Sequence, residues 1–202
     1  MKNSLELESR LQQYIYIAGV DEAGRGPWAG PVCAAAVILP RDYQNELIDD
    51  SKKIKPTQRS DLAEMIKQVA ISYTIVFESV AIIDQKNILQ ATKQAMLKAL
   101  INLNPHPDYI LIDAVKLDNL PVSSEAIIKG DQISLNIAAA SILAKVARDS
   151  YMMKLHEQYP RYRFDLHKGY GTKLHQQMLA KYGPIKGVHR FSYQPIKFLI
   201  HG

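Results

Sequence analysis

Four acidic residues have the type and spacing needed for chemistry at a phosphate. Asp21 and Glu22 end a run of strand-forming residues, and Asp113 ends a second apolar run further along the chain. Asp131 follows a Lys-Gly pair and precedes a long helical pattern. Ligands of open α/β sheets bind beyond the strand ends. We therefore expect the Asp21 and Asp113 carboxylates to converge if their two strands are neighbours.

Converging carboxylates require a cation, because several acids within a few ångströms cannot all stay ionised alone. Oxygen ligands without cysteine or clustered histidine favour Mg²⁺ or Mn²⁺ over zinc. Two such ions, about 3.5–4 Å apart, would activate water and stabilise charge on a phosphate under attack. The alternative is that each acid only caps a helix or lies in a solvated loop. The spacing favours a metal-dependent phosphotransfer site and leaves that alternative open.

A glycine-flanked arginine, Gly24-Arg25-Gly26, follows the paired acids at once. Glycine lacks a Cβ, so its backbone N–H and C=O groups can approach a sugar or phosphate closely. Arg25 could pair with a phosphate through two hydrogen bonds. The segment is either a cradle for a ligand or an ordinary turn.

These residues need strands and helices to hold them. Strand-forming runs alternate with helical apolar spacing, which is typical of an α/β layer architecture. The short link between the first two strands suits an antiparallel pair. We expect strands over 14–20, 32–39, 71–80, 109–112 and 126–128, and helices over about 56–69, 82–103, 134–159 and 173–181. In the second helix, the residues expected to face inward are Ile88, Leu89, Met96, Leu97 and Leu100.

Charge is unevenly distributed along the 202 residues. Residues 145–202 carry 11 Lys/Arg against 3 Asp/Glu, and they hold six of the eleven tyrosines. Basic residues interleaved with aromatics suit a nucleic acid, although a solvated basic surface is the alternative. We treat residues 1–202 as one domain whose portion from about 160 to 202 is basic and helical.

Composition narrows the class of protein. No apolar run approaches the ~18 residues that span a bilayer, and the polar first ten residues do not resemble a signal peptide. The single cysteine, Cys33, lies in an apolar run and is expected to be a buried thiol. We expect a cytoplasmic protein that does not contact membranes.

Several motifs along the chain resemble those of bacterial ribonuclease HII. They lie in the family's order across nearly the whole sequence: Val-Asp-Glu-Ala-Gly-Arg-Gly-Pro (20–27), Asp-Ser-Lys-Lys (50–53), Asn-Ile-Leu-Gln-Ala-Thr (87–92), Ile-Asp (112–113), Lys-Gly-Asp (129–131), Ile-Ala-Ala-Ala-Ser-Ile-Leu-Ala-Lys-Val-Ala-Arg-Asp (137–149), His-Lys-Gly-Tyr-Gly-Thr (167–172) and the segment from Gly-Pro (183–184) to His-Arg (189–190).

The resemblance implies a ribonuclease H-like fold, with a mixed, mostly five-stranded sheet flanked by helices and a small helical C-terminal portion. It places four ligands of Mg²⁺ or Mn²⁺ on Asp21, Glu22, Asp113 and Asp131. It also places a ribose 2′-OH sensor on Gly24, Arg25, Gly26 and Tyr170. This agrees with the role of the 2′-OH in distinguishing RNA from DNA. The alternative for Tyr170 is a packed aromatic.

The resemblance also supplies further expectations. Phosphate contacts could come from Lys52, Lys53, Lys145 and Arg148, unless these are only solvated. Asp149, His167 and His189 are expected to be mainly structural. The activity implied is endonucleolytic hydrolysis of the RNA strand of RNA–DNA hybrids, with cutting 5′ of ribonucleotides embedded in duplex DNA. Two ions would give 3′-hydroxyl and 5′-phosphate ends. We expect a monomer.

Three alternatives stay open from the sequence. A ribonuclease H-like nuclease acting on all-DNA junctions would not need the glycine-arginine-glycine turn. A non-catalytic nucleic-acid-binding protein would explain only the basic C-terminal portion and not the four acids. Residues 194–198 (Gln-Pro-Ile-Lys-Phe) could bind a sliding clamp, or they could be an ordinary tail.

Overall fold

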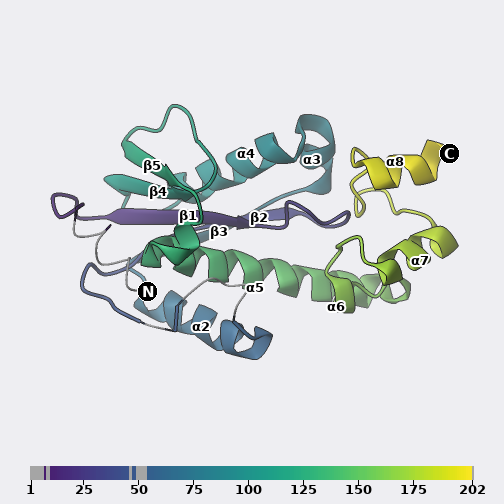
Figure 1. The fold of residues 1–202 in the computed structure, drawn as a ribbon, viewed down its shortest axis with the longest axis horizontal. Helices are drawn as coiled ribbons and strands as arrows, with labels where there is room; N and C mark the ends of the chain where they lie inside the picture. Colours follow the sequence, from purple (N-terminus) through teal and green to yellow (C-terminus); the bar gives the residue numbers. More distant parts are fainter. Residues whose placement is uncertain (1–6, 8–9, 46, 49–53, 202) are drawn as a thin grey trace.

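A mixed five-stranded sheet forms the centre of the computed structural model (Figure 1). The structure describes residues 7, 10–45, 47–48 and 54–201. The strand order is β3-β2-β1-β4-β5; β2 runs antiparallel to its neighbours β3 and β1, and β4 and β5 run parallel to β1. The strands are β1 (Ile17–Ala23), β2 (Val32–Ile38), β3 (Ser72–Glu78), β4 (Tyr109–Asp113) and β5 (Ser123–Ile127).

Helices cover both faces of this sheet. The helices on the sheet are α2 (Pro56–Val69), α3 (Val80–Lys86), α4 (Ile88–Ile101) and α5 (Leu135–Gln158). Three further helices follow α5 in the chain: α6 (Phe164–His167), α7 (Lys173–Tyr182) and α8 (Gln194–His201). Short 3₁₀ turns are η1 (Gly130–Gln132) and η2 (Pro160–Tyr162). In Figure 1, α3 and α4 lie above the sheet, and α2 and α5 lie below it. Two apolar clusters fill these interfaces, one between the sheet and α5 with α2, the other between the sheet and α4. Cys33 is fully buried in the first of them, as expected.

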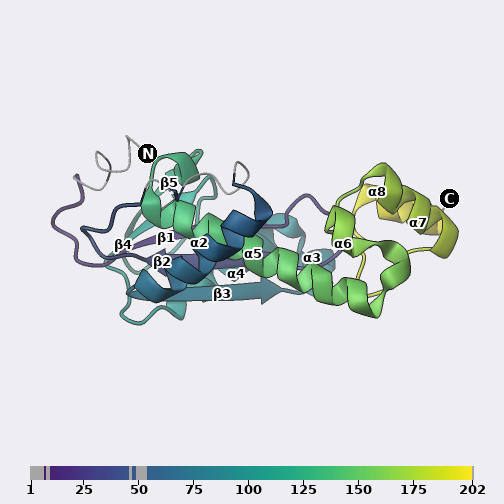
Figure 2. The same cartoon turned by 90° about the horizontal axis from the view of Figure 1, so that it is seen from below.

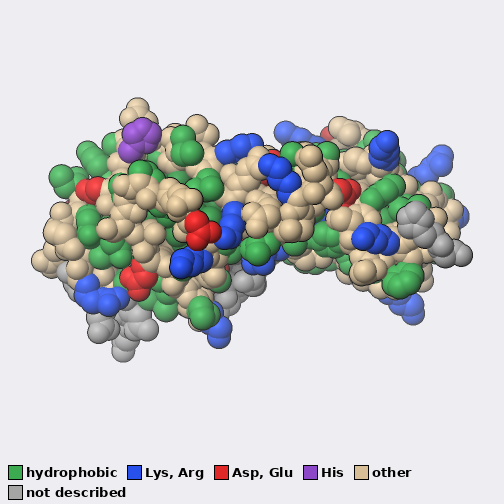
Figure 3. Space-filling model, turned by 90° about the horizontal axis from the view of Figure 1, so that it is seen from above, with side chains coloured by type: hydrophobic (Ala, Val, Ile, Leu, Met, Phe, Trp, Pro, Cys, Tyr) green, Lys and Arg blue, Asp and Glu red, His purple; other side chains and the backbone are tan. Residues whose placement is uncertain are grey.

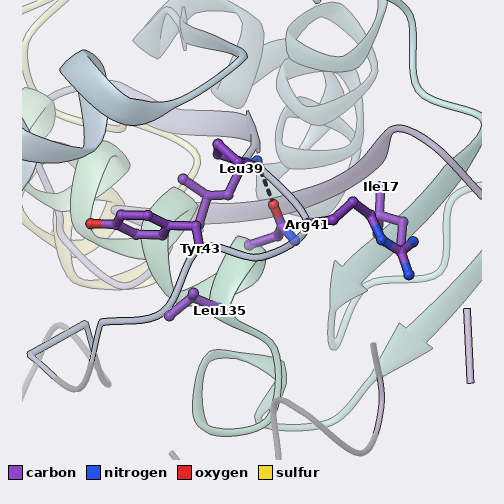
Figure 4. A pocket seen from close by; sticks show the side chains of 7 residues that line it. Ile17, Leu39, Arg41, Tyr43 and Leu135 are labelled. Atoms are coloured by element: carbon purple, nitrogen blue, oxygen red, sulfur yellow. Dashed lines mark hydrogen bonds between the residues drawn. The ribbon is translucent and has the colours of Figure 1, made fainter. Parts of the chain in front are cut away.

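Helix α5 packs on the sheet at its start and leads into the C-terminal residues at its end. Its alanine-rich start packs closely on β1: a Cβ added to Gly19 would lie 2.2 Å from the carbonyl carbon of Asn136. The side chain of Asn136 also accepts a hydrogen bond from the backbone N–H of Leu39, 2.8 Å away (Figure 4). The small cavity drawn there opens beside Arg41 and Tyr43, and it lies against the same N-terminal end of α5.

The C-terminal lobe, residues 159–201, lies at one end of the molecule. Figures 1 and 2 show α5 running out from under the sheet toward η2 and the helices α6, α7 and α8. A third apolar cluster, centred on Phe164, Met152 and Tyr162, joins the end of α5 to this lobe. In the described residues, no helix is long and apolar enough to cross a membrane.

Most expected elements are present, and several bounds differ. The first strand continues to Ala23, so Asp21 and Glu22 lie within it rather than beyond it. The expectation of a single helix over 82–103 is wrong, because Asn87, with φ 68°, separates α3 from α4. The Asn87 side chain caps α4 by accepting a hydrogen bond from the N–H of Gln90. The next residue but one, Leu89, is 41% exposed and does not face inward.

Candidate active site

Asp21 and Asp113 lie on adjacent parallel strands, as the candidate site requires. The register pairs Val20 of β1 with Ile112 of β4, and each acid is the next residue along its strand. Val20 and Ile112 both face the cluster under α4. Because side chains alternate along a strand, both carboxylates lie on the opposite face, against α5.

The carboxylate of Asp21 is held in a buried, polar contact with α5. It is 5% exposed. The Ser141 hydroxyl and the backbone N–H of Glu22, 2.6 Å from its Oδ1, donate hydrogen bonds to it. Burial, followed by the charges of Glu22 and Asp113, holds the pKa of Asp21 well above its ordinary value. Three carboxylates are therefore within electrostatic reach of one another at this strand end.

The turn η1, which carries Asp131, is bound to the end of β4. The neighbouring Gly130 donates its N–H to Oδ1 of Asp113 at 2.7 Å. A Cβ added to Gly130 would lie 2.5 Å from the end of the Ile137 side chain and 3.4 Å from that same oxygen, so a larger residue here would require Ile137 to move. Asp131 is buried one residue further on. The turn thus brings a fourth acid to the ends of β4 and β5.

Glu22 follows Asp21 on β1, and strand alternation turns its side chain toward the opposite face of the sheet. Its Oε1 lies 3.5 Å from Nη1 of Arg25. Among the residues that the structure describes, no group of three or more Asp, Glu, His or Cys side chains is close enough to hold one metal ion. A bound ion would therefore have to draw the four acids closer together.

The chemistry of these acids nevertheless fits a hard divalent cation. All of the donors are carboxylate oxygens, which Mg²⁺ and Mn²⁺ prefer. The raised pKa of Asp21 reflects burial and like charges, and a cation would offset both. The residues that would hold such an ion are Asp21, Glu22, Asp113 and Asp131.

The turn after β1 is held by two buried arginines. Gly24 has φ 99°, and a Cβ at this position would lie 2.0 Å from Nε of Arg148, so both conformation and space require glycine. Arg190 donates hydrogen bonds to the carbonyl oxygens of Gly24 (2.6 Å) and Arg25 (2.9 Å). Because the carbonyls of Gly24 and Arg25 bind the protein interior, the groups of the turn available to a ligand are backbone N–H groups, the carbonyl of Gly26 and the exposed Arg25 side chain.

Tyr170 lies beside this turn although 144 residues separate it from Gly26 in the sequence. A Cβ added to Gly26 would lie 3.7 Å from Cε1 of the Tyr170 ring. The ring is not packed away, since Tyr170 is 42% exposed. Lys145 Nζ lies 6.0 Å from its centroid. The structure thus brings together the turn, Tyr170 and Lys145, which the sequence placed far apart.

The interpretation of Arg148 as a phosphate contact does not agree with the structure. Arg148 is fully buried, and it donates hydrogen bonds to the carbonyl oxygens of Pro31, Lys168 and Ala29, each 3.1 Å away. Burial and nearby Arg190 lower the pKa of Arg148 to about 10. Its guanidinium is engaged in joining β2 to the C-terminal lobe. An arginine in a motif can serve backbone carbonyls as well as phosphates, and sequence alone does not separate these uses.

The remaining lysines have separate outcomes. Lys145 pairs with Asp149 at 2.8 Å and stays half-buried beside Tyr170. Asp149 also lies 3.8 Å from Arg59, so it joins α5 to α2, as expected of a structural acid. Lys52 and Lys53 lie outside the described residues.

Sequence reasoning missed three residues that shape the site. Ser141 hydrogen-bonds Asp21, Arg190 binds the turn, and His175 binds the carbonyl oxygen of Tyr170 at 2.9 Å. Ser141 could have been found as the only hydroxyl among the alanines at the start of α5. Arg190 has no local signal, because the carbonyls that it binds in the turn lie about 165 residues away. His175 binds a carbonyl only five residues away, and its side chain type alone does not indicate that contact.

The segment considered for a sliding clamp forms part of helix α8. Ile196 is fully buried in the cluster around Phe164, whereas Phe198 is 73% exposed. The helix therefore packs on the lobe through one side and presents an aromatic ring to solvent on another.

Comparisons with known proteins give the family. A sequence model described as Ribonuclease HII matches residues 18–196. Ribonuclease HII of Oceanobacillus iheyensis is 54% identical over 194 residues, covering 96% of this chain and 74% of that protein. The Caldicellulosiruptor bescii enzyme of the same name is 48% identical over 194 residues, covering 95% and 94%.

Solved structures show the same fold. The ribonuclease H2 of Pyrococcus horikoshii OT3 matches with a TM-score of 0.78 and 24% identity, covering 91% of this chain and 96% of that one. Bst-RNase HIII in complex with Mn²⁺ matches with a TM-score of 0.73 and 16% identity, covering 92% and 69%. The RNase HII of the Archaeoglobus fulgidus PCNA complex matches with a TM-score of 0.73 and 24% identity, covering 92% of this chain and 97% of that one. The fold is ribonuclease H-like, and the chain belongs to the ribonuclease HII family of hydrolytic enzymes.

Proposed function

We propose that this protein cuts the RNA strand of RNA–DNA hybrids and also cuts 5′ of ribonucleotides embedded in duplex DNA. The observation that carries the proposal is the proximity of the Tyr170 ring to the Gly24–Gly26 turn, since a Cβ added to Gly26 would lie 3.7 Å from the ring. The turn begins two residues after Glu22. A ribose that contacts the turn would have its neighbouring phosphate close to Asp21. The names of the relatives, all ribonuclease HII, support the same substrate class.

The turn and Tyr170 would read the sugar. Backbone groups of Gly24, Arg25 and Gly26 would contact the 2′-OH, and the exposed Tyr170 side chain would add its hydroxyl and pack its ring on the adjoining sugar. A site that hydrogen-bonds a hydroxyl group discriminates strongly against the analogue without it. The 2′-OH is read here and is not the nucleophile.

The acids would serve the reaction at the phosphate. Two Mg²⁺ or Mn²⁺ ions, when bound by Asp21, Glu22, Asp113 and Asp131, would supply an activated water and neutralise charge on the scissile phosphate. The Ser141 hydroxyl and the Gly130 N–H hold the carboxylates of Asp21 and Asp113 in place. The products would carry a 3′-hydroxyl and a 5′-phosphate.

The basic C-terminal lobe and Lys145 would attract the duplex. Figure 3 shows Lys and Arg side chains on the lobe and at its junction with the sheet. Lys52 and Lys53 are proposed as further phosphate contacts. The exposed side of α8 stays a candidate for contact with a sliding clamp, supported by the relative that was solved with PCNA. We propose that the enzyme acts as a single-domain monomer.

One experiment tests the proposal against its alternatives. The enzyme is incubated with Mg²⁺ or Mn²⁺ and a labelled duplex containing one ribonucleotide, beside its all-DNA twin. We expect a single cut 5′ of the ribonucleotide and none in the twin. Cleavage of both duplexes would favour a DNA nuclease, and metal-independent binding without product would favour a non-catalytic protein.

Variants assign the roles. Asp113→Asn should abolish cleavage while duplex binding persists, whereas Asp118→Asn, at an exposed acid paired with Lys93, should cut at the wild-type rate.

Tyr170→Ala should slow cleavage at a single ribonucleotide by roughly tenfold, equivalent to about 1.4 kcal/mol of barrier. Turnover by Asp113→Asn would overturn the assignment of the acids, and an unchanged rate for Tyr170→Ala would remove its role in reading the sugar.

A further inference from the structure

Arg190 binds the turn from inside the C-terminal lobe. Besides the carbonyl oxygens of Gly24 and Arg25, its guanidinium donates hydrogen bonds to those of Gly30 (3.0 and 2.9 Å) and Pro31 (3.1 Å). The side chain is fully buried. A buried charge must be satisfied by hydrogen bonds, and here four backbone carbonyls from one loop do so. The guanidinium therefore fixes the path of the backbone from Gly24 to Pro31.

The preceding residue, His189, leads to the other half of the proposed sensor. Its Nδ1 accepts a hydrogen bond from the N–H of Ile185 at 2.9 Å, which leaves the proton of the neutral ring on Nε2. That Nε2 lies 3.2 Å from Nε2 of His175. The His175 Nδ1 lies 2.9 Å from the carbonyl oxygen of Tyr170, to which it must donate. One neutral tautomer of each ring satisfies all three contacts.

Backbone contacts run alongside this chain of side chains. The N–H of Arg190 donates to the carbonyl of Trp28, and the N–H of Trp28 donates to the carbonyl of Gly169, both at 2.8 Å. An isolated antiparallel bridge pairs Ala29 with His189. The loop that carries the turn is thus hydrogen-bonded both to the segment of His189 and Arg190 and to the loop that carries Tyr170.

We propose that His189 and Arg190 are positioning residues that set the placement of Tyr170 relative to the Gly24–Gly26 turn and thereby set ribose selectivity. The proposal rests on the function proposed above for the turn and Tyr170. Neither residue reaches a substrate, because both are fully buried. They act through geometry: a displacement of about 1 Å in a site can cost roughly a hundredfold in rate.

Buried hydrogen bonds of this kind give rigidity that exposed contacts lack. The rings of His167 and His175 stack at 4.2 Å, and Phe164 packs on the edges of both, so His175 cannot turn away from Tyr170 without repacking the lobe. On the other side, Asp84 of α3 accepts hydrogen bonds from the N–H groups of Phe191 and Ser192. The segment after Arg190 is thereby fixed to the sheet domain.

The test is a double-mutant cycle on cleavage of a duplex with one ribonucleotide. Arg190→Lys keeps the charge but cannot reach four carbonyls, and we expect kcat/KM to fall by roughly tenfold. If Arg190 acts through the sensor, the same substitution in a Tyr170→Ala background should cost little more, because groups that act as a unit are not additive. Arg41→Lys, at an arginine that donates hydrogen bonds to the carbonyls of Leu11 and Tyr14 in the sheet domain, is the control and should be additive.

A second variant keeps the proposal testable if Arg190→Lys does not fold. His189→Asn retains an acceptor for the Ile185 N–H but loses the contact with His175, and it should lower kcat several-fold with the metal-free duplex affinity unchanged. Tyr162→Phe, which loses the hydroxyl bond to the carbonyl of Gly183, is its control for general loosening of the lobe. Nitrogen NMR should show the proton of His189 on Nε2 and that of His175 on Nδ1.

The outcomes separate this inference from the proposed function. Wild-type enzyme that does not distinguish the ribonucleotide duplex from its twin, or a Tyr170→Ala variant with unchanged rate, would overturn the proposed function itself. A Tyr170→Ala variant that loses rate, together with additive effects of Arg190→Lys and a wild-type kcat for His189→Asn, would overturn only the positioning role.

Discussion

Asp21 is buried in the folded protein at a cost. Its carboxylate lies under α5 with Glu22 and Asp113 nearby, and burial with these like charges raises its pKa. The folded state therefore holds the ionised form less well than the unfolded chain does. The Ser141 hydroxyl and the Glu22 N–H offset only part of this cost, since the pKa stays raised after both. Stability is given up at the position where the proposed ions would bind.

Removing that charge should therefore stabilise the metal-free protein. Because the folded pKa of Asp21 is raised, its destabilising effect is present at pH 8 and disappears as the pH falls below the unfolded value. We expect Asp21→Asn to raise the free energy of unfolding at pH 8 by roughly 0.5–2 kcal/mol, the usual size of a stabilising substitution. Urea unfolding at pH 8 and pH 5 measures the gain, which should shrink at pH 5.

Two controls accompany this measurement. Asp165→Asn should not stabilise, since a hydrogen bond from Arg163 lowers the pKa of that partly exposed carboxyl. Addition of Mg²⁺ should stabilise wild type and not Asp21→Asn, because the ion binds only the folded site. A less stable Asp21→Asn protein at pH 8 would contradict the account of this carboxylate.

Helix α5 contacts both the candidate metal-binding acids and the proposed sugar sensor. Ser141, Lys145 and Arg148 recur at helical spacing on one face of it. They contact Asp21, the Tyr170 ring and the turn residue Gly24 respectively. Because one rigid element touches all three, the distance from the acids to the proposed sugar sensor is fixed by the rise of a helix.

The same helix shows what could be predicted from the sequence. The expected span of about 134–159 is confirmed, because the Ser134 side chain caps the start of α5 and Pro160 follows its end. Whether the Asp21 and Asp113 strands are neighbours was left open by the sequence, and the structure pairs them in parallel. The break at Asn87 could not be predicted from apolar spacing, because that spacing continues across it and the capping side chain alone decides the end.

The error over Arg148 has a different physical cause. A guanidinium can donate hydrogen bonds both to phosphate oxygens and to backbone carbonyl oxygens, so residue type and motif position do not decide between these partners. The choice depends on Ala29, Pro31 and Lys168, whose carbonyls converge only after folding. The family motif located the important residue, and the structure supplied its partners.

The histidines of the C-terminal lobe should make it acid-sensitive. Burial, then neighbouring histidines, lowers the pKa of His175 to about 4 and that of His189 to about 3. The two imidazoles therefore stay unprotonated in the folded protein, while the same histidines in the unfolded chain gain protons below about pH 6.5. Stability should fall as the pH drops from about 6.5 toward 4, by up to roughly 1.4 kcal/mol per pH unit for each histidine.

Substitution isolates this effect from that of the carboxylates. His189→Asn does not titrate, so its stability deficit relative to wild type should shrink between pH 7 and pH 4. Urea unfolding of both proteins across this range measures the difference. A deficit that is constant with pH would show that His189 does not exclude protons in the folded state.

At the scale of the whole molecule, the groups proposed to attract the duplex and those proposed to select the ribose lie in different environments. Lys and Arg side chains lie exposed on the lobe (Figure 3), whereas the groups that shape the sugar sensor, Arg148 and Arg190, are fully buried. Salt screens exposed charges much more than buried ones. The two properties should therefore respond differently to ionic strength.

A salt titration tests this separation. Binding of a ribonucleotide-containing duplex without metal should weaken by roughly tenfold or more between 50 and 200 mM KCl, through counterion release. The preference in cleavage rate for that duplex over its all-DNA twin should stay constant. Fluorescence anisotropy and gel assays measure the two quantities, and a preference that falls in step with affinity would contradict the prediction.

The buried arginines bind oxygens that all twenty amino acids possess. Arg190 and Arg148 hold the loop from Gly24 to Pro31 by carbonyl groups and not by its side chains. The shape of the loop is therefore insulated from changes in its exposed side chains, such as that of Arg25. Natural drift or laboratory evolution can vary the chemistry displayed by the turn while its backbone stays the same.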